Sequence, residues 1–275
     1  MTRPIRAILA ARAALVLGTA ACAVAALALV PPRCAAQTPP VEGSPAGEPG
    51  VERGEIRDEG RLLITQNGKS VRVEDFAFEN LRGALVVRAG SRPSPAGQPE
   101  RPVDKSMILT VGPLDYAMGS YWSQLTVGPD TLRRGVEVAG GDTVVSVWRE
   151  VNGAGTGDKV AFPPGRVYIL DPPLFTTFNF IGRTLQGKPC DHRPIRVFVL
   201  GPRDSLVDGT VTDAGNETIR WGGRPVVARK LVIADQKTSF TAWFTSDGRM
   251  LRLEQPQAAI RVERKAPALG PPRPR

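Results

Sequence analysis

The sequence predicts a mainly β protein: an antiparallel meander that forms a strongly curved sheet, a half barrel or an open barrel. Three observations support this fold class. Apolar residues recur with a period of two in many short runs, as they do in strands with one buried face. The dipeptides Asn67-Gly68 and Asp247-Gly248 are strong hairpin signals between such runs. Only one segment, Pro172–Gln186, has a helical period, so we expect one short helix or lid there.

The first half of the chain begins with a hairpin around Asn67-Gly68, flanked by alternating apolar residues between positions 63 and 78. We expect three segments to be turns or loops: the proline-rich residues 89–103, Gly140-Gly141-Asp142, and the glycine-rich residues 153–157. The last of these lacks the lysine and the following helix of a phosphate-binding loop. The other strands expected in this half cover residues 84–88, 106–111, 116–127, 131–139, 143–151 and 166–170.

The second half repeats this pattern of short apolar runs and turns, with Asp247-Gly248 as its clearest hairpin signal. Consecutive strands joined by short turns are typical of an antiparallel meander. The strands expected in this half cover residues 195–200, 205–212, 217–221, 226–233, 239–245, 250–254 and 259–263.

The composition excludes several classes of protein. Of the 275 residues, 41% are hydrophobic and 23% are charged, which excludes full disorder and a polytopic membrane protein. Three cysteines and one histidine are too few for a disulfide scaffold, a four-cysteine site or a multi-histidine site. We therefore expect no metal site and no cofactor.

The N-terminus has the pattern of an export signal. Three arginines precede an uncharged run over residues 13–30, and small residues follow at positions 34–36. This pattern predicts a secretory signal peptide over residues 1–36, cleaved after Ala36. The alternative is an uncleaved anchor, because an 18-residue helix would be about 27 Å long, close to the roughly 30 Å thickness of a bilayer core.

The predicted leader sets the expected compartment and partners. We expect an exported protein, periplasmic or extracellular, with inner-membrane anchoring as the alternative. Residues 1–36 carry four arginines and no acids, so their removal lowers the formal net charge from +9 to +5. This modest charge on an exported protein excludes nucleic acid as a partner and leaves a weak attraction to anionic membrane surfaces, so peripheral membrane contact is compatible.

Three segments follow the leader. Residues 37–54 are rich in proline, glycine and glutamate and read as a disordered linker. Residues 55–264 hold the strand-like runs, and this length suits a single β domain. Residues 265–275 are a proline-rich tail that we also expect to be disordered.

The segment 172–186 and the tryptophans are the candidate ligand-binding elements. Leu174, Phe175, Phe178 and Ile181 fall on one helical face, whereas Phe180 lies off it. This pattern suits either core packing against the sheet or a lid over an apolar cavity. The candidate ligand-binding residues are Leu174, Phe175, Phe178, Ile181, Trp148 and Trp243, and the expected ligand is a lipid or another apolar small molecule.

Cys190 and His192 form the only cluster that suggests catalysis. A cysteine beside a histidine provides a nucleophile and a base, and Asp191 stands between them. The flanking prolines favour a plain loop instead, and no other part of the chain matches a thiol-enzyme signature. Catalysis by Cys190 and His192 is therefore a minor alternative. Cys190 is the one cysteine left after signal cleavage, which excludes an intramolecular disulfide.

The C-terminal residues 223–263 carry a resemblance to known proteins. Arg224–Ile233 is followed by Phe240–Arg249, in which a tryptophan precedes an Asp-Gly hairpin, and a returning strand pairs back. This arrangement resembles a group of bacterial envelope proteins of unknown function, whose curved antiparallel sheets are similar to those of periplasmic lipoprotein carriers. The resemblance implies a concave apolar face covered by residues 172–186. The segment 89–103 has no counterpart in those carriers, and no functional residue is carried over.

Three functions follow from these observations. The leading hypothesis is an exported, non-catalytic protein that binds an apolar or amphipathic, lipid-like ligand. The first alternative is a structural or interaction module of the cell envelope with an envelope protein as its partner. The second alternative is a thiol-dependent enzyme that uses Cys190 and His192.

Overall fold

The computed structural model describes residues 52–95, 103–138, 144–162, 166–188, 190–201 and 203–267. The chain divides into two units, residues 1–54 and residues 55–275, and the folded elements below belong to the second unit. The predicted signal peptide (1–36), most of the predicted linker (37–54) and the end of the predicted tail (265–275) lie outside the described residues.

The described residues form fifteen strands in one continuous sheet, and the first strand in the sequence lies at the centre of that sheet. From β1 the strands step outward to β8 at one edge; the chain then passes to β9 at the other edge and steps back to β15, which pairs with β1. The strands of the first series are β1 (Glu55–Gln66), β2 (Lys69–Leu81), β3 (Ala84–Pro93), β4 (Val103–Val111), β5 (Met118–Val127), β6 (Asp130–Val138), β7 (Val144–Val151) and β8 (Ala154–Ala161). Those of the second series are β9 (Val167–Leu170), β10 (Arg193–Val199), β11 (Ser205–Trp221), β12 (Arg224–Ala234), β13 (Ser239–Phe244), β14 (Met250–Gln255) and β15 (Ile260–Arg264), with a 3₁₀ turn, η3 (Pro256–Ala258), before β15.

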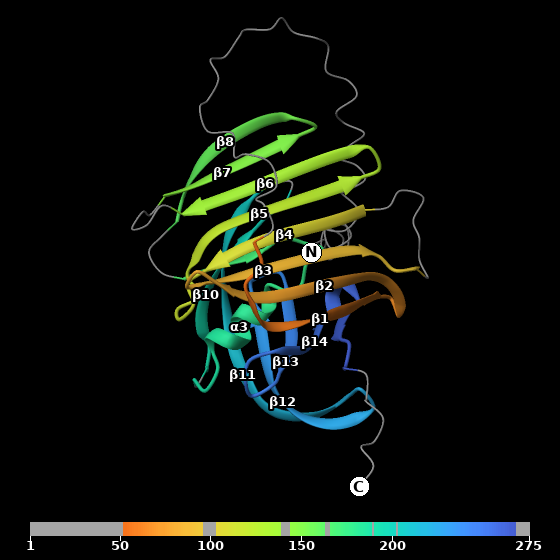
Figure 1. Cartoon of the computed structure of the whole chain (residues 1–275). Coiled ribbons are helices and arrows are strands. Elements are labelled where there is room, and N and C mark those ends of the chain that lie inside the picture. The colour runs from red at the N-terminus through yellow and green to blue at the C-terminus, as the bar shows by residue number, and fades with distance from the viewer. Residues whose placement is uncertain are drawn as a thin grey trace, which may run out of the picture. The chain divides into compact units, whose positions relative to one another are not determined.

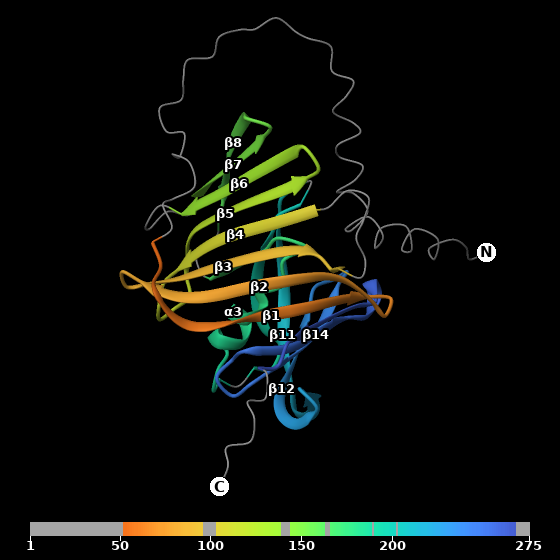
Figure 2. The same ribbon diagram turned by 45° about the vertical axis from the view of Figure 1, so that its right-hand side comes forward.

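The chain connectivity requires this sheet to roll up. A flat sheet of this size would place β8 and β9 about 65 Å apart at the usual spacing of about 4.8 Å between strands. The link from Ala161 to Val167 can span only about 20 Å. The two edges must therefore approach each other, and Figures 1 and 2 show the strongly curved sheet that results. The sheet is not closed by a backbone ladder between β8 and β9, which confirms the predicted open, curved architecture.

The strand pairing matches a meander with two exceptions. The first strand, β1, pairs with the last, β15. Strands β9 and β10 run parallel, with Val167 opposite Arg196, whereas every other neighbouring pair is antiparallel. The hairpin signal at Asn67-Gly68 is confirmed, because both residues have the positive φ values (51° and 74°) that such a turn requires.

Two of the expected loops are wrong. Residues 89–93 continue strand β3 and pair with residues 72–76 of β2, so the proline-rich loop expected over 89–103 begins later. The glycine-rich residues 153–157 lie largely in strand β8, which pairs with β7 along its whole length. In both segments the backbone ladder to a neighbouring strand outweighs a poor intrinsic strand propensity. The two strands expected at 205–212 and 217–221 are one long strand, β11, interrupted by an irregularity between Asp213 and Asn216.

Among the residues that the structure describes, one short α-helix, α3 (Phe178–Thr184), packs inside the curved sheet and confirms the helix expected within 172–186. Figures 1 and 2 show α3 between the strands that include β1 and those that include β11. Six of its seven residues are buried. Phe180, which the periodicity places off the apolar face, is only 4% exposed. The helix is therefore surrounded by apolar side chains and belongs to the core. No helix among the described residues is long and apolar enough to cross a membrane.

Candidate binding cleft

Four of the predicted ligand-binding residues lie together in the interior. Leu174, Phe175, Phe178 and Ile181 are each at most 8% exposed and belong to the main hydrophobic core. A residual cavity beside Phe180 measures only about 10 Å³, roughly the space that one water molecule occupies. The segment thus occupies the interior itself as part of the packed core.

Close aromatic packing holds α3 in this position. Phe180 packs against Phe78 of β2 with ring centroids 5.6 Å apart, and Phe178 packs against Phe240 of β13 at 5.0 Å. Gly182 lies so close to β13 that a methyl group there would approach Phe244 Cδ1 to 2.2 Å. These are the contacts of a tightly packed core, and they join the helix to strands from both series.

Buried polar groups anchor the start of the helical segment. The carboxylate of Glu74, on β2, accepts hydrogen bonds from the backbone N–H groups of Phe175 (2.7 Å) and Thr176 (2.9 Å). Glu74 is fully buried, and burial raises the pKa of its carboxyl group above the usual value despite these two hydrogen bonds. The side-chain carbonyl of Asn179 accepts a hydrogen bond from Met250 N–H at 2.8 Å, which ties α3 to β14.

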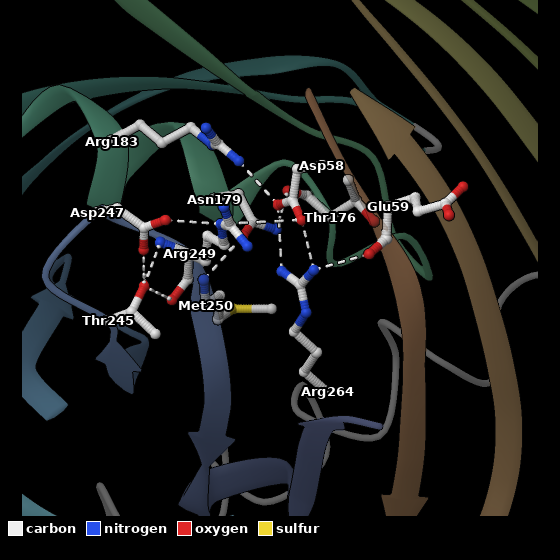
Figure 3. A network of polar contacts seen from close by, with 10 residues as sticks. All are labelled: Asp58, Glu59, Thr176, Asn179, Arg183, Thr245, Asp247, Arg249, Met250 and Arg264. Carbon is white, nitrogen blue, oxygen red and sulfur yellow. Dashed lines mark hydrogen bonds and ion pairs between the residues drawn. The ribbon is translucent and has the colours of Figure 1, made fainter. Parts of the chain in front are cut away.

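A cluster of arginines around Asp58 holds the other end of the helix (Figure 3). The buried carboxylate of Asp58, on β1, accepts hydrogen bonds from Arg264 of β15 (2.5 and 3.1 Å) and from Arg183 of α3 (2.7 Å). Arg249 approaches the same carboxylate at 4.0 Å and pairs with Asp247 at 2.7 Å. The cluster thus connects α3 to β1 and β15, which are neighbouring strands at the centre of the sheet.

A second buried cluster fastens β9 to the opposite part of the sheet. Asp171 directly follows β9, and one of its oxygens accepts hydrogen bonds from Tyr121 (2.5 Å) and Ser123 (2.9 Å) of β5. Its other oxygen pairs with the Lys105 ammonium of β4, which also donates to the Pro172 carbonyl at 2.8 Å. Burial lowers the pKa of Lys105 and raises that of Tyr121. Side chains, and not a backbone ladder, thus join β9 to β4 and β5.

The two predicted tryptophans lie away from α3. Trp148 points to the face of β7 opposite the buried Val147, and its indole nitrogen lies over Gly135 of β6, where an added methyl group would be only 1.9 Å away. Trp243 belongs to a separate buried cluster, and its indole N–H donates to Glu217 of the β11–β12 hairpin at 3.2 Å. The structure does not bring either tryptophan to the four interior residues.

Cys190 and His192 do not pair with each other. The Cys190 thiol is buried and donates to the Val211 carbonyl at 3.1 Å, and burial raises its pKa. The His192 side chain is 76% exposed, and its Nδ1 lies 3.2 Å from the Thr212 hydroxyl. This geometry favours the protonated thiol, whereas thiol catalysis uses the thiolate. Among the described residues, no group of three histidine, cysteine, aspartate or glutamate side chains is placed to hold a metal ion.

A cleft of about 310 Å³ opens where β9, β10 and β11 meet. Its lining includes three arginines as well as a tyrosine, a proline and an isoleucine. Arg196 pairs with the carboxylate of Asp208 at 3.0 Å, directly across the β10–β11 ladder. The lining residues are Arg166, Tyr168, Arg193, Pro194, Ile195, Arg196 and Asp208.

The guanidinium groups of Arg166 and Arg193 make no hydrogen bond or ion pair with any other described residue, and Arg166 Nε is buried without a partner. Guanidinium groups without a protein partner can bind an anion through charge-assisted hydrogen bonds. The cleft is therefore the candidate functional site.

No pattern in the sequence points directly to this cleft. Its arginines lie in two segments, residues 166–170 and 193–199, that are separated by the helical segment. They meet because β9 pairs in parallel with β10. An antiparallel meander does not predict that pairing.

Comparisons with known proteins bear on the fold alone. No protein-family model and no curated protein matches the chain. A solved structure, the beta-barrel-like protein of domain of unknown function DUF1849 from Brucella abortus, is similar with a TM-score of 0.50 and 10% sequence identity. The match covers 78% of this chain and 97% of that one. It supports the expected likeness to bacterial proteins of unknown function with a curved β-sheet. The finer resemblance to lipoprotein carriers stays a prediction.

Proposed function

We propose that the chain is an exported, non-catalytic protein that binds an amphipathic, lipid-like ligand with an anionic group, and that the ligand binds in the arginine-lined cleft. Tyr168 carries this proposal. It lines the cleft together with Ile195 and with Arg166 and Arg193, two arginines that have no partner among the described residues. The cleft thus offers apolar and cationic groups to one molecule, which is the arrangement an amphipathic ligand requires.

The charges of the cleft support an anionic head group. Guanidinium groups bind carboxylate and phosphate oxygens through paired hydrogen bonds, and these are stronger than hydrogen bonds between neutral groups. Arg166 and Arg193 have no partner among the described residues, so binding breaks no existing ion pair at these two positions.

The packing of the interior supports binding at the edge of the sheet. The four interior residues predicted to bind ligand are packed against α3 and the sheet, and polar anchors hold both ends of that segment. An acyl chain in the interior would displace these contacts. The cleft, in contrast, already has a volume of about 310 Å³.

Export is part of the proposal and rests on the N-terminal sequence pattern. The test is cell fractionation of the full chain with a C-terminal tag. Recovery of a protein shortened by the leader in the periplasm supports export with cleavage, whereas a full-length cytoplasmic protein contradicts it.

Ligand binding is tested with two detergents that share one alkyl chain, dodecyl phosphate and dodecyl maltoside, below their micelle-forming concentrations. Calorimetry with residues 37–275 should show dodecyl phosphate binding at least about tenfold tighter, a difference of about 1.4 kcal/mol. Replacing Arg166 and Arg193 together by alanine should abolish this preference. Arg224→Ala, at an exposed arginine of β12, is the matched control and should preserve it. Equal binding of the two detergents contradicts the proposal.

The exposed edge strand β8 favours the alternative function, an interaction module of the envelope. Seven of its eight residues are exposed, and among the described strands it pairs with β7 alone. A free strand edge is a template for a strand from another protein. Crosslinking in intact cells from a photoreactive residue at position 157 tests this function: a discrete crosslinked partner supports it, and a lack of crosslinks contradicts it.

A further inference from the structure

We infer that the cleft is selective for a dianionic phosphate monoester over singly charged acids and phosphate diesters. This inference rests on the proposed function and names the chemical class of the head group. It is carried by the charges that line the cleft, by the unpartnered guanidinium groups and by the size of the opening.

The charges of the lining leave an excess of two positive charges. Arg166, Arg193 and Arg196 supply three cations, and Asp208 supplies one anion. Asp208 lies opposite Arg196 on the neighbouring strand and pairs with its Nε at 3.0 Å, so it offsets one of the three. A phosphate monoester carries close to two negative charges at pH 7. A carboxylate or a phosphate diester carries one and would leave one guanidinium uncompensated.

The positions of the unpartnered donors fit a group with several acceptor oxygens. Arg166 directly precedes β9, and Arg193 begins β10, so the two guanidinium groups reach the cleft from adjacent parallel strands. A carboxylate has two oxygens, whereas a phosphate monoester has three terminal oxygens and can accept from two guanidinium groups at once.

The cleft also has room for the organic part of the ligand. Its volume of about 310 Å³ lies at the lower end of ordinary small-molecule pockets, which span about 300–1,000 Å³. The phosphate group alone would fill only part of it. Tyr168, Pro194 and Ile195 provide the apolar surface against which the remainder would pack. A phosphate monoester of a lipid and a soluble phosphate monoester share this chemistry.

Methyl phosphate and dimethyl phosphate provide the direct test, because they have nearly the same size and differ in charge. Calorimetry with residues 37–275 should show methyl phosphate binding at least about tenfold more tightly. Replacing Arg166 and Arg193 by alanine should remove that selectivity, and Arg224→Ala should keep it. Thermal unfolding of each variant shows whether it is folded.

Asp208→Asn provides a second test of the charge argument. The side chain is 81% exposed, so the substitution should leave the protein folded. It releases Arg196 and adds one positive charge to the cleft. We expect dimethyl phosphate to bind about threefold more tightly to this variant than to the wild type. Unchanged affinity would overturn the charge argument.

The remaining outcomes distinguish a soluble phosphate monoester from a lipid one. They also distinguish failure of this inference from failure of the proposed function. Selective binding of free methyl phosphate supports the inference and a soluble source. Cosedimentation with phosphatidylcholine vesicles that contain phosphatidic acid, but not with those that contain phosphatidylglycerol, supports the inference and a lipid source. Equal affinity for methyl and dimethyl phosphate, with equal binding to the two kinds of vesicle, overturns the inference. The proposed function still stands in that case if dodecyl phosphate binds in an arginine-dependent manner, and it falls as well if dodecyl phosphate does not bind.

Discussion

The two free edges of the sheet differ in almost every respect. Strand β8 has eight residues, seven of them exposed, and it pairs with β7 along its whole length. Strand β9 has four residues, three of them buried. Asp171 directly after β9 is bound by Lys105, Tyr121 and Ser123 across the sheet. One edge is thus open to solvent, whereas the other is built into the core.

This difference explains where a binding site can form. Side-chain contacts hold β9 in place, and the parallel pairing of β9 with β10 brings Arg166 beside Arg193 and Arg196. A fixed strand can hold unpartnered donors in a defined geometry, which is what selective binding needs. Strand β8 offers mainly backbone groups and small side chains, which suit the addition of another strand.

The largest effect is expected from breaking the cluster that fixes β9. Lys105→Met leaves Asp171 buried without its cation, which should lower the free energy of unfolding by about 3–5 kcal/mol. The matched control is Lys159→Met on the exposed β8, which should change it by less than about 0.5 kcal/mol. Urea denaturation measures both. Similar losses for the two variants would show that the two edges do not differ in this way.

The next effect concerns the helix that fills the interior. Gly182→Ala places a methyl group 2.2 Å from Phe244 and 2.7 Å from the Gly248 carbonyl, so we expect a loss of about 1–3 kcal/mol. Gly157→Ala on β8 meets no atom closer than 3.8 Å and should change stability by less than about 0.5 kcal/mol. Thermal unfolding compares them. A Gly182→Ala protein as stable as the wild type would mean that α3 packs more loosely than the structure indicates.

A pH-dependent effect is expected at Glu74. Its raised pKa means that the fold favours the protonated carboxyl, so this contribution to stability is present below the usual pKa of about 4.5 and is lost as the pH rises through the folded-state value. Glu74→Gln removes the titration. The variant should therefore gain stability relative to the wild type as the pH rises above the usual glutamate value. Chemical denaturation across that range measures the difference, and a constant difference contradicts the expectation.

The smallest effect is expected at the cleft itself. Asp208→Asn removes an ion pair whose aspartate is 81% exposed, and such pairs contribute about 1 kcal/mol or less. We expect a change in unfolding free energy of less than about 0.5 kcal/mol, although the variant should alter anion binding. A larger loss in urea denaturation would make Asp208 a structural residue of the β9 edge.

The sequence predicts the fold class well because a strand with one buried face has apolar residues at every second position. That signal fails for β8, since its glycines provide no alternating side chains and its pairing with β7 decides the structure. The apolar pattern also misleads in the segment 172–186. There the spacing of Leu174, Phe175, Phe178 and Ile181 indicates a helix with one apolar face. The sheet surrounds the helix, so Phe180 and Gly182 on its other faces are buried too.

The candidate cleft could not be predicted for a different reason. Its residues come from two segments that only the tertiary fold makes adjacent, and a meander gives no cause to pair β9 with β10 in parallel. The aromatic candidates follow from helical and strand spacing in the sequence, which does not specify their tertiary neighbours. The structure places them in the interior, over Gly135, and beneath the β11–β12 hairpin.

Hydrogen exchange with and without dodecyl phosphate tests the central claim, binding at the β9 edge, most directly. We expect the ligand to slow amide exchange in β9 (Val167–Leu170) and β10 (Arg193–Val199), the strands that line the cleft. Exchange in α3 (Phe178–Thr184) and in β8 should not change. Altered exchange in α3 with no change in β9 and β10 would place the ligand in the interior and contradict this account.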